Sequence, residues 1–132
     1  MLGGGNPVGG NPAGTGTGLN YVGNHAYAYS GTQSATNVPV TLLDFTIGAH
    51  YVKGIIQFYQ PPNQGTDNMG FDVSINGEKV YGIEFVQGAD SGRYNEMVVI
   101  IAPYDHIQIT SNNFSGTSGR EVGVNIVGRV YA

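Results

Sequence analysis

The hairpin signal in residues 71–86, FDVSINGEKVYGIEFV, constrains the fold more than any other part of the chain. In its first half, apolar residues at 71, 73 and 75 alternate with polar ones, which is the period of a half-buried β-strand. Asn76-Gly77 then supplies two residues that tolerate positive φ, as the type I′ turn of a two-residue hairpin requires. The pattern therefore predicts two antiparallel strands joined by a tight turn.

Strand-like segments recur along the rest of the chain, and no segment has a convincing helical period. Gly and Pro mark the junctions between them. Regular short strands separated by turn signals indicate an all-β sandwich or barrel. Several loops are too long for tight hairpins, which favours an eight-stranded, jelly-roll-like β-sandwich over an up-and-down barrel. We expect its strands at 24–30, 38–47, 50–60, 71–75, 80–85, 95–103, 104–112 and 120–132.

The alternation also predicts which side chains form the core. Gly54, in the middle of 50–60, predicts either a bulge or a close approach of another backbone. The largely apolar run NEMVVIIAP (95–103) predicts a strand buried on both faces. The predicted core consists of Val40, Leu42, Phe45, Ile47, Val52, Ile55, Ile56, Phe58, Phe71, Val73, Ile75, Ile83, Phe85, Val98, Ile100, Ile107, Ile109, Val124, Ile126 and Val130.

The first eighteen residues, MLGGGNPVGGNPAGTGTG, differ from the rest because they hold eight glycines, two Asn-Pro steps and no charge. Ordering such residues costs about 1–2 kcal/mol each in backbone entropy, so contacts with a partner must supply the difference. We expect an extended Gly-rich N-terminal arm over 1–18 and a single sandwich domain over 19–132. The arm residues expected to bind a partner are Met1, Leu2, Asn6, Pro7, Val8, Asn11 and Pro12.

Charge is scarce in this chain of 132 residues, of which 11% are charged. Such a surface is either a polar Thr, Asn, Gln and Gly surface or one that partners cover. The net charge is −4 and the five basic residues are scattered, so direct binding of nucleic acid is not expected. No apolar run approaches the roughly 20 residues of a membrane helix. The chain has no cysteine, which excludes disulfides and thiolate metal sites.

Catalysis needs a nucleophile, a base or a metal held in mutual reach, and we find none of the usual arrangements. The segment ADSG (89–92) is typical of an ordinary turn. The three histidines lack metal-ligand spacing and are expected to be half-exposed on strands. Asp67 and Asp72 belong to a loop of the kind that calcium sites use, but the loop matches no EF-hand or nonapeptide repeat. We therefore expect no catalytic residue, no metal site, no cofactor and no enzymatic activity.

The nine tyrosines are a high load for a chain without tryptophan. Tyrosine buries a ring and keeps a polar group, which suits protein interfaces and sugar stacking, or simply caps a small core. Tyr21, Tyr27 and Tyr29 are the candidate interface aromatics. The loops at 61–70 and 87–95 are the candidate glycan-binding loops, because they are rich in Asp and Asn.

Three segments carry a resemblance to known proteins: GTGTGLNYVGNHAYAYSG (14–31), VVIIAPYDHIQIT (98–110) and VGRVYA (127–132). The chain resembles small structural proteins encoded by phages and viruses of aquatic microbes. That resemblance implies a jelly-roll capsid decoration, or cement, protein that sits as a trimer on the virion surface. The implied partners are the major capsid protein or other virion subunits. The resemblance brings no catalytic residues with it.

Two functions follow from these observations. The first is a non-enzymatic virion structural protein whose arm and sandwich surface bridge shell subunits. The alternative is a carbohydrate-binding or receptor-binding β-sandwich module of a phage fibre or lectin-like protein. Binding of a sugar at the loops would favour the alternative, and contacts from residues 1–18 to shell subunits would favour the first.

Overall fold

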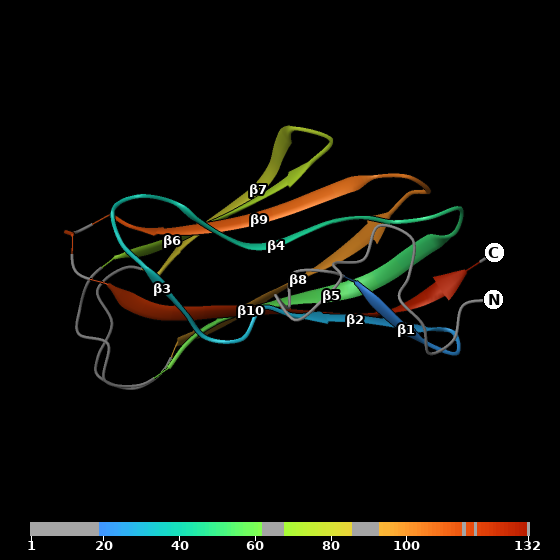
Figure 1. Ribbon diagram of the computed structural model, residues 1–132, viewed down its shortest axis with the longest axis horizontal. Coiled ribbons are helices and arrows are strands. Elements are labelled where there is room, and N and C mark those ends of the chain that lie inside the picture. Colours follow the sequence, from blue (N-terminus) through green and yellow to red (C-terminus); the bar gives the residue numbers. More distant parts are fainter. Residues whose placement is uncertain (1–18, 62–67, 86–92, 115, 118, 132) are drawn as a thin grey trace.

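The computed structural model describes residues 19–61, 68–85, 93–114, 116–117 and 119–131 (Figure 1). Within these residues the chain forms ten β-strands and no helix, and therefore no helix long and apolar enough to cross a membrane. The strands are β1 (Asn20–Val22), β2 (His25–Tyr29), β3 (Gln33–Ala35), β4 (Val40–Thr46), β5 (Tyr51–Gln60), β6 (Met69–Ile75), β7 (Glu78–Phe85), β8 (Arg93–Ile101), β9 (His106–Asn113) and β10 (Arg120–Tyr131).

The strands form two antiparallel sheets that pack as a sandwich (Figure 1). The six-stranded sheet has the order β1-β2-β10-β5-β8, and β3 also pairs with β10. The four-stranded sheet has the order β4-β9-β6-β7. The all-β sandwich expected from the sequence is thus confirmed, with ten strands in place of eight.

The two strands that the sequence did not reveal are β1 and β3, of three residues each. Three residues are too few to display an alternating pattern. β1 joins β2 through a two-residue turn in which Gly23 has a φ of 58°, a conformation that glycine adopts at little cost. β3 pairs with the first residues of β10, a part of that strand with which β2 does not pair.

Strand pairing is nested around the hairpin that the sequence predicts. Asn76 and Gly77 have φ values of 54° and 85°, so the expected tight turn is present. β6 pairs with β7, β5 with β8, β4 with β9, and β2 and β3 with β10. A long hairpin with this nesting, rolled into two sheets, is what the expected jelly-roll arrangement requires.

The core lies between the sheets and includes the fully buried rings of Phe58 and Phe71, whose centroids are 5.3 Å apart. Two predicted core residues are wrong: Val98 and Ile100 are 64% and 65% exposed. Their neighbours Val99 and Ile101 point inward and are buried instead. β8 belongs to a sheet with one open face, so its side chains alternate between core and solvent although residues 97–101 are all apolar. Ile55, Val40, Ile75 and Ile83 are only partly buried.

Gly54 marks a close approach of two backbones, one of the two interpretations left open by the sequence. It pairs directly with Gly128 of β10, and the register on either side is continuous. A Cβ atom on Gly54 would lie 2.8 Å from the carbonyl oxygen of Val127. One on Gly128 would lie 2.6 Å from the carbonyl oxygen of Lys53 and 2.8 Å from the Cα of Gly54. The close contact between β5 and β10 therefore depends on both glycines.

Candidate binding face

The candidate site is the surface of the six-stranded sheet that points away from the four-stranded sheet, which we call the outer face. Side chains alternate along a strand, so the outer face takes the odd-numbered residues of β2, β5 and β10 and the even-numbered residues of β8. The strand register arranges these side chains in rows that run across the strands.

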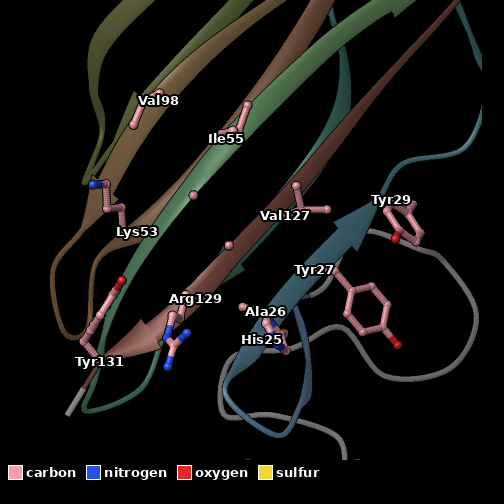
Figure 2. Close-up of a pocket in the computed structure, with 12 residues that line it drawn as sticks. His25, Ala26, Tyr27, Tyr29, Lys53, Ile55, Val98, Val127, Arg129 and Tyr131 are labelled. Atoms are coloured by element: carbon pink, nitrogen blue, oxygen red, sulfur yellow. The ribbon is translucent and has the colours of Figure 1, made fainter.

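An apolar row crosses the middle of the outer face. Ile55 lies opposite Val127 on one side and opposite Val98 on the other. Tyr27 continues the row beyond Val127. Figure 2 shows these side chains in succession across β8, β5, β10 and β2. The apolar row consists of Tyr27, Val127, Ile55 and Val98.

A cationic row runs beside the apolar row. Arg129 lies directly opposite Lys53 across β10 and β5, and His25 lies on the other side of Arg129. The row ends on β8 at Ile100, which is exposed. Like charges directly opposite each other destabilise a sheet. The arrangement is therefore one that an acidic group from outside the sheet would stabilise.

The row on the opposite side of the apolar row is polar and ends in an acid. Asn125 pairs with Gln57, and Gln57 pairs with Glu96. The hydroxyl of Tyr94 donates a hydrogen bond of 2.5 Å to Glu96, and this bond is the main reason why the pKa of Tyr94 is raised. The polar row consists of Tyr29, Asn125, Gln57 and Glu96.

Tyrosines lie at both ends of the outer face. Tyr131 pairs with Tyr51 beyond the cationic row, and Tyr59 pairs with Tyr94 beyond the polar row. The Tyr59 ring packs over Gly123, where a Cβ atom would lie 2.2 Å from the ring. The outer face thus has an aromatic pair at each end of a charged and apolar centre.

The outer face is hollowed where Gly54 and Gly128 meet. The hollow has a volume of about 680 Å³ and is open to solvent. Its walls are mostly the apolar row, with the cationic row along one side (Figure 2). The guanidinium carbon of Arg129 lies 5.9 Å from the centre of the Tyr131 ring at the end of the hollow.

The three candidate interface tyrosines divide between this face and the core. Tyr29 is 52% exposed and Tyr27 is half-buried; their ring centroids are 5.4 Å apart with an angle of 39° between the planes. Tyr21 is only 8% exposed and belongs to the core. Burial raises the pKa of Tyr21, and a backbone hydrogen bond with Gly48 opposes part of that rise. Tyr21 therefore offers no open ring to a partner.

Other candidates from the sequence lie elsewhere or outside the described residues. Residues 1–18, and with them the seven arm residues, are not among those described. Of the candidate glycan loops, only residues 61, 68–70 and 93–95 are described, and Met69 and Arg93 there begin β6 and β8. Asp72 forms an ion pair of 2.9 Å with Lys79, and Asp67 lies outside the described residues. Among the residues described, no group of three or more His, Asp or Glu side chains is placed to hold a metal ion.

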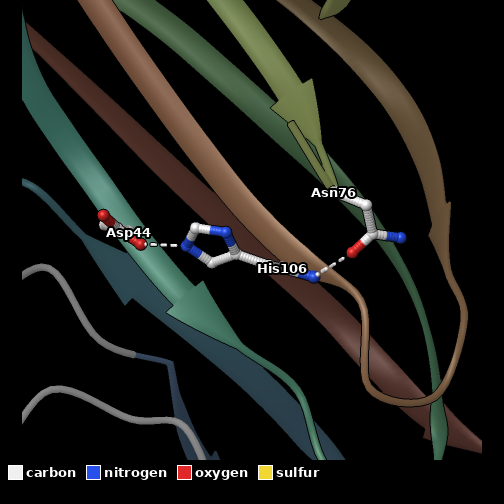
Figure 3. Close-up of polar contacts among 3 residues, drawn as sticks. All are labelled: Asp44, Asn76 and His106. Atoms are coloured by element: carbon white, nitrogen blue, oxygen red, sulfur yellow. Dashed lines mark hydrogen bonds and ion pairs between the residues drawn. The ribbon is translucent and has the colours of Figure 1, made fainter. Parts of the chain in front are cut away.

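Another group of polar contacts lies on the four-stranded sheet and joins the hairpin turn to β9 (Figure 3). The Nε2 atom of His106 contacts the carboxylate of Asp44 on the neighbouring strand. The backbone N–H of His106 donates to the side-chain oxygen of Asn76 at 2.9 Å, and Asn76 in turn donates to Asp105 at 2.8 Å. No nucleophile accompanies His106 in these contacts. Their evident effect is to hold the turn against the start of β9.

The outer face could not be recognised from the sequence, although two of its tyrosines were candidate interface aromatics. Ile55, Val98 and Ile100 were expected in the core instead, the last two because VVII (98–101) is continuous and apolar. Only the pairing of β8 at the sheet edge shows which of them point outward. The one available signal was the alternation of Tyr and Ala in HAYAY (25–29), which places tyrosines on one face and small residues on the other.

Comparisons with known proteins give no family for this chain. No protein-family profile and no curated protein matches its sequence. Similar solved structures include a protein of Bacillus endospore appendages, described as disulfide-linked pili (12% identity, TM-score 0.48, 80% of this chain and 86% of that chain). Another is a family 35 carbohydrate-binding module from Cellvibrio japonicus (19% identity, TM-score 0.48, 96% and 87%). A third is the infectious bursal disease virus VP2 subviral particle (12% identity, TM-score 0.46, 85% and 34%). Likenesses at such low TM-scores carry no argument about what this chain binds.

Proposed function

We propose that this protein is a non-enzymatic structural subunit of a virion, a decoration or cement protein that acts by contact with other protein subunits. The observation that carries the proposal is the apolar row on the outer face: Val98 is 64% exposed, Tyr27, Ile55 and Val127 are half-buried, and none of the four belongs to the buried core. Contiguous exposed apolar side chains in a folded domain are typical of a surface that a protein covers.

The chemistry of the outer face suits protein contact better than catalysis. Its centre is aliphatic, its two ends are aromatic, and its charged groups flank the centre. This is the distribution found in protein interfaces, where an apolar centre is surrounded by polar groups. The arm at 1–18 would add a second attachment by lying extended along a neighbouring shell subunit, with its Asn-Pro steps in extended or turn conformation. Weak contacts of both kinds, repeated by the symmetry of a shell, would combine into strong attachment.

One observation favours the alternative, a carbohydrate-binding module. Tyr27 and Tyr29 place two rings side by side at the margin of the hollow, next to the amide of Asn125. Sugars stack on aromatic rings and hydrogen-bond to amides. The aliphatic centre of the outer face offers a sugar no hydrogen bonds, so we place this function second.

The test uses particles purified from the native source of this sequence. We expect the chain to sediment with the particles, and a photo-crosslinker at position 98 to join it to a virion subunit or to another copy. The same crosslinker at Val80, which is 51% exposed on β7, is the matched control and should give fewer products. Absence of the chain from the particles, or equal crosslinking from both positions, would contradict the proposal. Binding on a glycan array that Tyr27→Ala and Tyr29→Ala remove would establish the alternative.

A further inference from the structure

We infer that the outer face is covered by the outer face of a second copy of this chain, related to the first by a two-fold axis along the apolar row. The inference rests on the proposed function and names its immediate partner. Three properties of the outer face carry it: the order of its rows, the position of its charges and its area.

The order of the rows is nearly symmetric about the apolar row. Along β5 and β10 the outer face begins with Tyr51 and Tyr131 and ends with Tyr59, and the apolar pair of Ile55 and Val127 lies halfway between. A two-fold axis through that pair brings the apolar row of one copy onto the apolar row of the other. It also brings Tyr51 of each copy onto Tyr59 of the other, and Tyr131 onto Gly123, which the Tyr59 ring covers. An interface made from the same patch on both subunits must be its own complement, and this face is.

The charges make the same axis favourable. The two-fold operation exchanges the cationic row with the polar row, so that Lys53 of one copy lies over Gln57 of the other. Glu96 of that second copy lies one strand further, about 5 Å away, within reach of a lysine side chain. Each copy contributes one such pair. The cationic row, which has no acidic residue in it, thereby gains an acidic partner.

A rotation about an axis parallel to the strands, as in a trimer whose strands run along its three-fold axis, does not bring an acidic residue to the cationic row. Such a rotation leaves the position of each row along the strands unchanged, so the cationic row of one copy approaches the cationic row of the next. Like charges placed together at an interface are unfavourable. The charges on the outer face therefore favour a two-fold pair over the trimer that the resemblance implies.

The area is sufficient for a specific contact. β5, β8 and β10 contribute nine paired residues each and β2 contributes five, so at about 4.8 Å between strands and about 3.3 Å per residue the flat footprint is roughly 510 Å² per copy. Two copies together bury roughly 1,000 Å², which is about the smallest value expected of a biological interface. A foreign partner would need an apolar centre and the opposite order of charges, both of which this chain already supplies.

The experiment measures the mass of the purified full chain by sedimentation equilibrium over a range of concentrations. We expect a monomer–dimer equilibrium for the natural sequence. Val98→Asp should remove the dimer, and Val80→Asp, at a similarly exposed valine of the other sheet, should leave it unchanged. Lys53→Glu and Glu96→Lys should each weaken the dimer about tenfold to a hundredfold, because each pair occurs twice. The double variant should recover most of that loss.

The outcomes separate this inference from the proposed function. A natural sequence that stays monomeric, a trimer, or a double variant no tighter than either single variant would overturn the two-fold pair. An equal effect of Val80→Asp would do the same. All four results concern the isolated chain and leave the particle experiment to decide the function. Conversely, if the double variant recovers the dimer but the chain never sediments with particles, the two-fold pair is supported and the virion role is overturned. Circular dichroism and thermal melting show that each variant is folded.

Discussion

Gly128→Ala is expected to destabilise the sandwich, because the methyl group has no space between β10 and β5. The added Cβ atom would lie 2.6 Å from the carbonyl oxygen of Lys53 and 2.8 Å from the Cα of Gly54. Both neighbours are backbone atoms, so the strands must separate where their register is otherwise continuous. Overpacking of this kind costs about 1–3 kcal/mol. Replacing glycine also reduces the conformational entropy of the unfolded chain, which favours the folded state by about 0.4–1 kcal/mol.

The net decrease in the free energy of unfolding is then about 1–2 kcal/mol. Unfolding entropy is about 2.1 cal/mol/K per residue, so each kcal/mol lowers the Tm of a chain of this length by roughly 4 °C. We expect a Tm lower by roughly 4–8 °C, measured by circular dichroism at fixed protein concentration because self-association stabilises the folded state. Gly116→Ala is the matched control: apart from its chain neighbours, no atom of the described residues lies within 4 Å of its Cβ position, so its Tm should stay close to that of the natural sequence. A Gly128→Ala protein that melts within about 1 °C of the natural sequence would refute the reasoning from backbone contact.

Three further predictions test other parts of the account. Deletion of residues 1–18 should leave the Tm nearly unchanged and weaken attachment to particles in a sedimentation assay; a truncated chain that does not fold would show that the arm belongs to the core. His106→Ala should lower the free energy of unfolding in urea by less than about 1 kcal/mol, since both side chains of its contact with Asp44 are nearly half exposed to solvent, and a larger loss would show a deeper structural role. Glu96→Gln should lower the pKa of Tyr94, followed by ultraviolet absorbance, because the charge-assisted hydrogen bond that raises it is lost. A raised folded-state pKa means that the Tyr94 contribution to stability is complete below the ordinary tyrosine pKa of 10.0 and is lost as the pH rises through the folded value; an unchanged pKa in Glu96→Gln would contradict the assigned cause.

Local sequence patterns predicted those parts of the fold that depend on local chemistry. The type I′ turn follows from the conformational freedom of Asn76 and Gly77, and the inward-facing residues follow from alternation wherever polar residues mark the outer positions. The close contact at Gly54 was also foreseeable, although the sequence did not identify Gly128 as its partner.

The outer face was not predictable in the same way, because burial depends on what covers a strand. Val98 and Ile100 are as apolar as Val99 and Ile101, and only the register of β8 against β5 separates the two pairs. The rows on the outer face depend on register between strands that are distant in sequence. Ile55 and Val127, for instance, are 72 positions apart and become neighbours only through the pairing of β5 with β10.

Coverage of the outer face by protein can be measured directly as a loss of thiol accessibility on assembly. The chain has no cysteine, so Val98→Cys and Val80→Cys each introduce a single probe, one on each sheet. Labelling rates with a thiol reagent would be compared between dilute protein and concentrated or particle-bound protein. We expect the thiol at 98 to become protected on assembly and the thiol at 80 to keep its labelling rate. Equal labelling of both thiols in every state would contradict it.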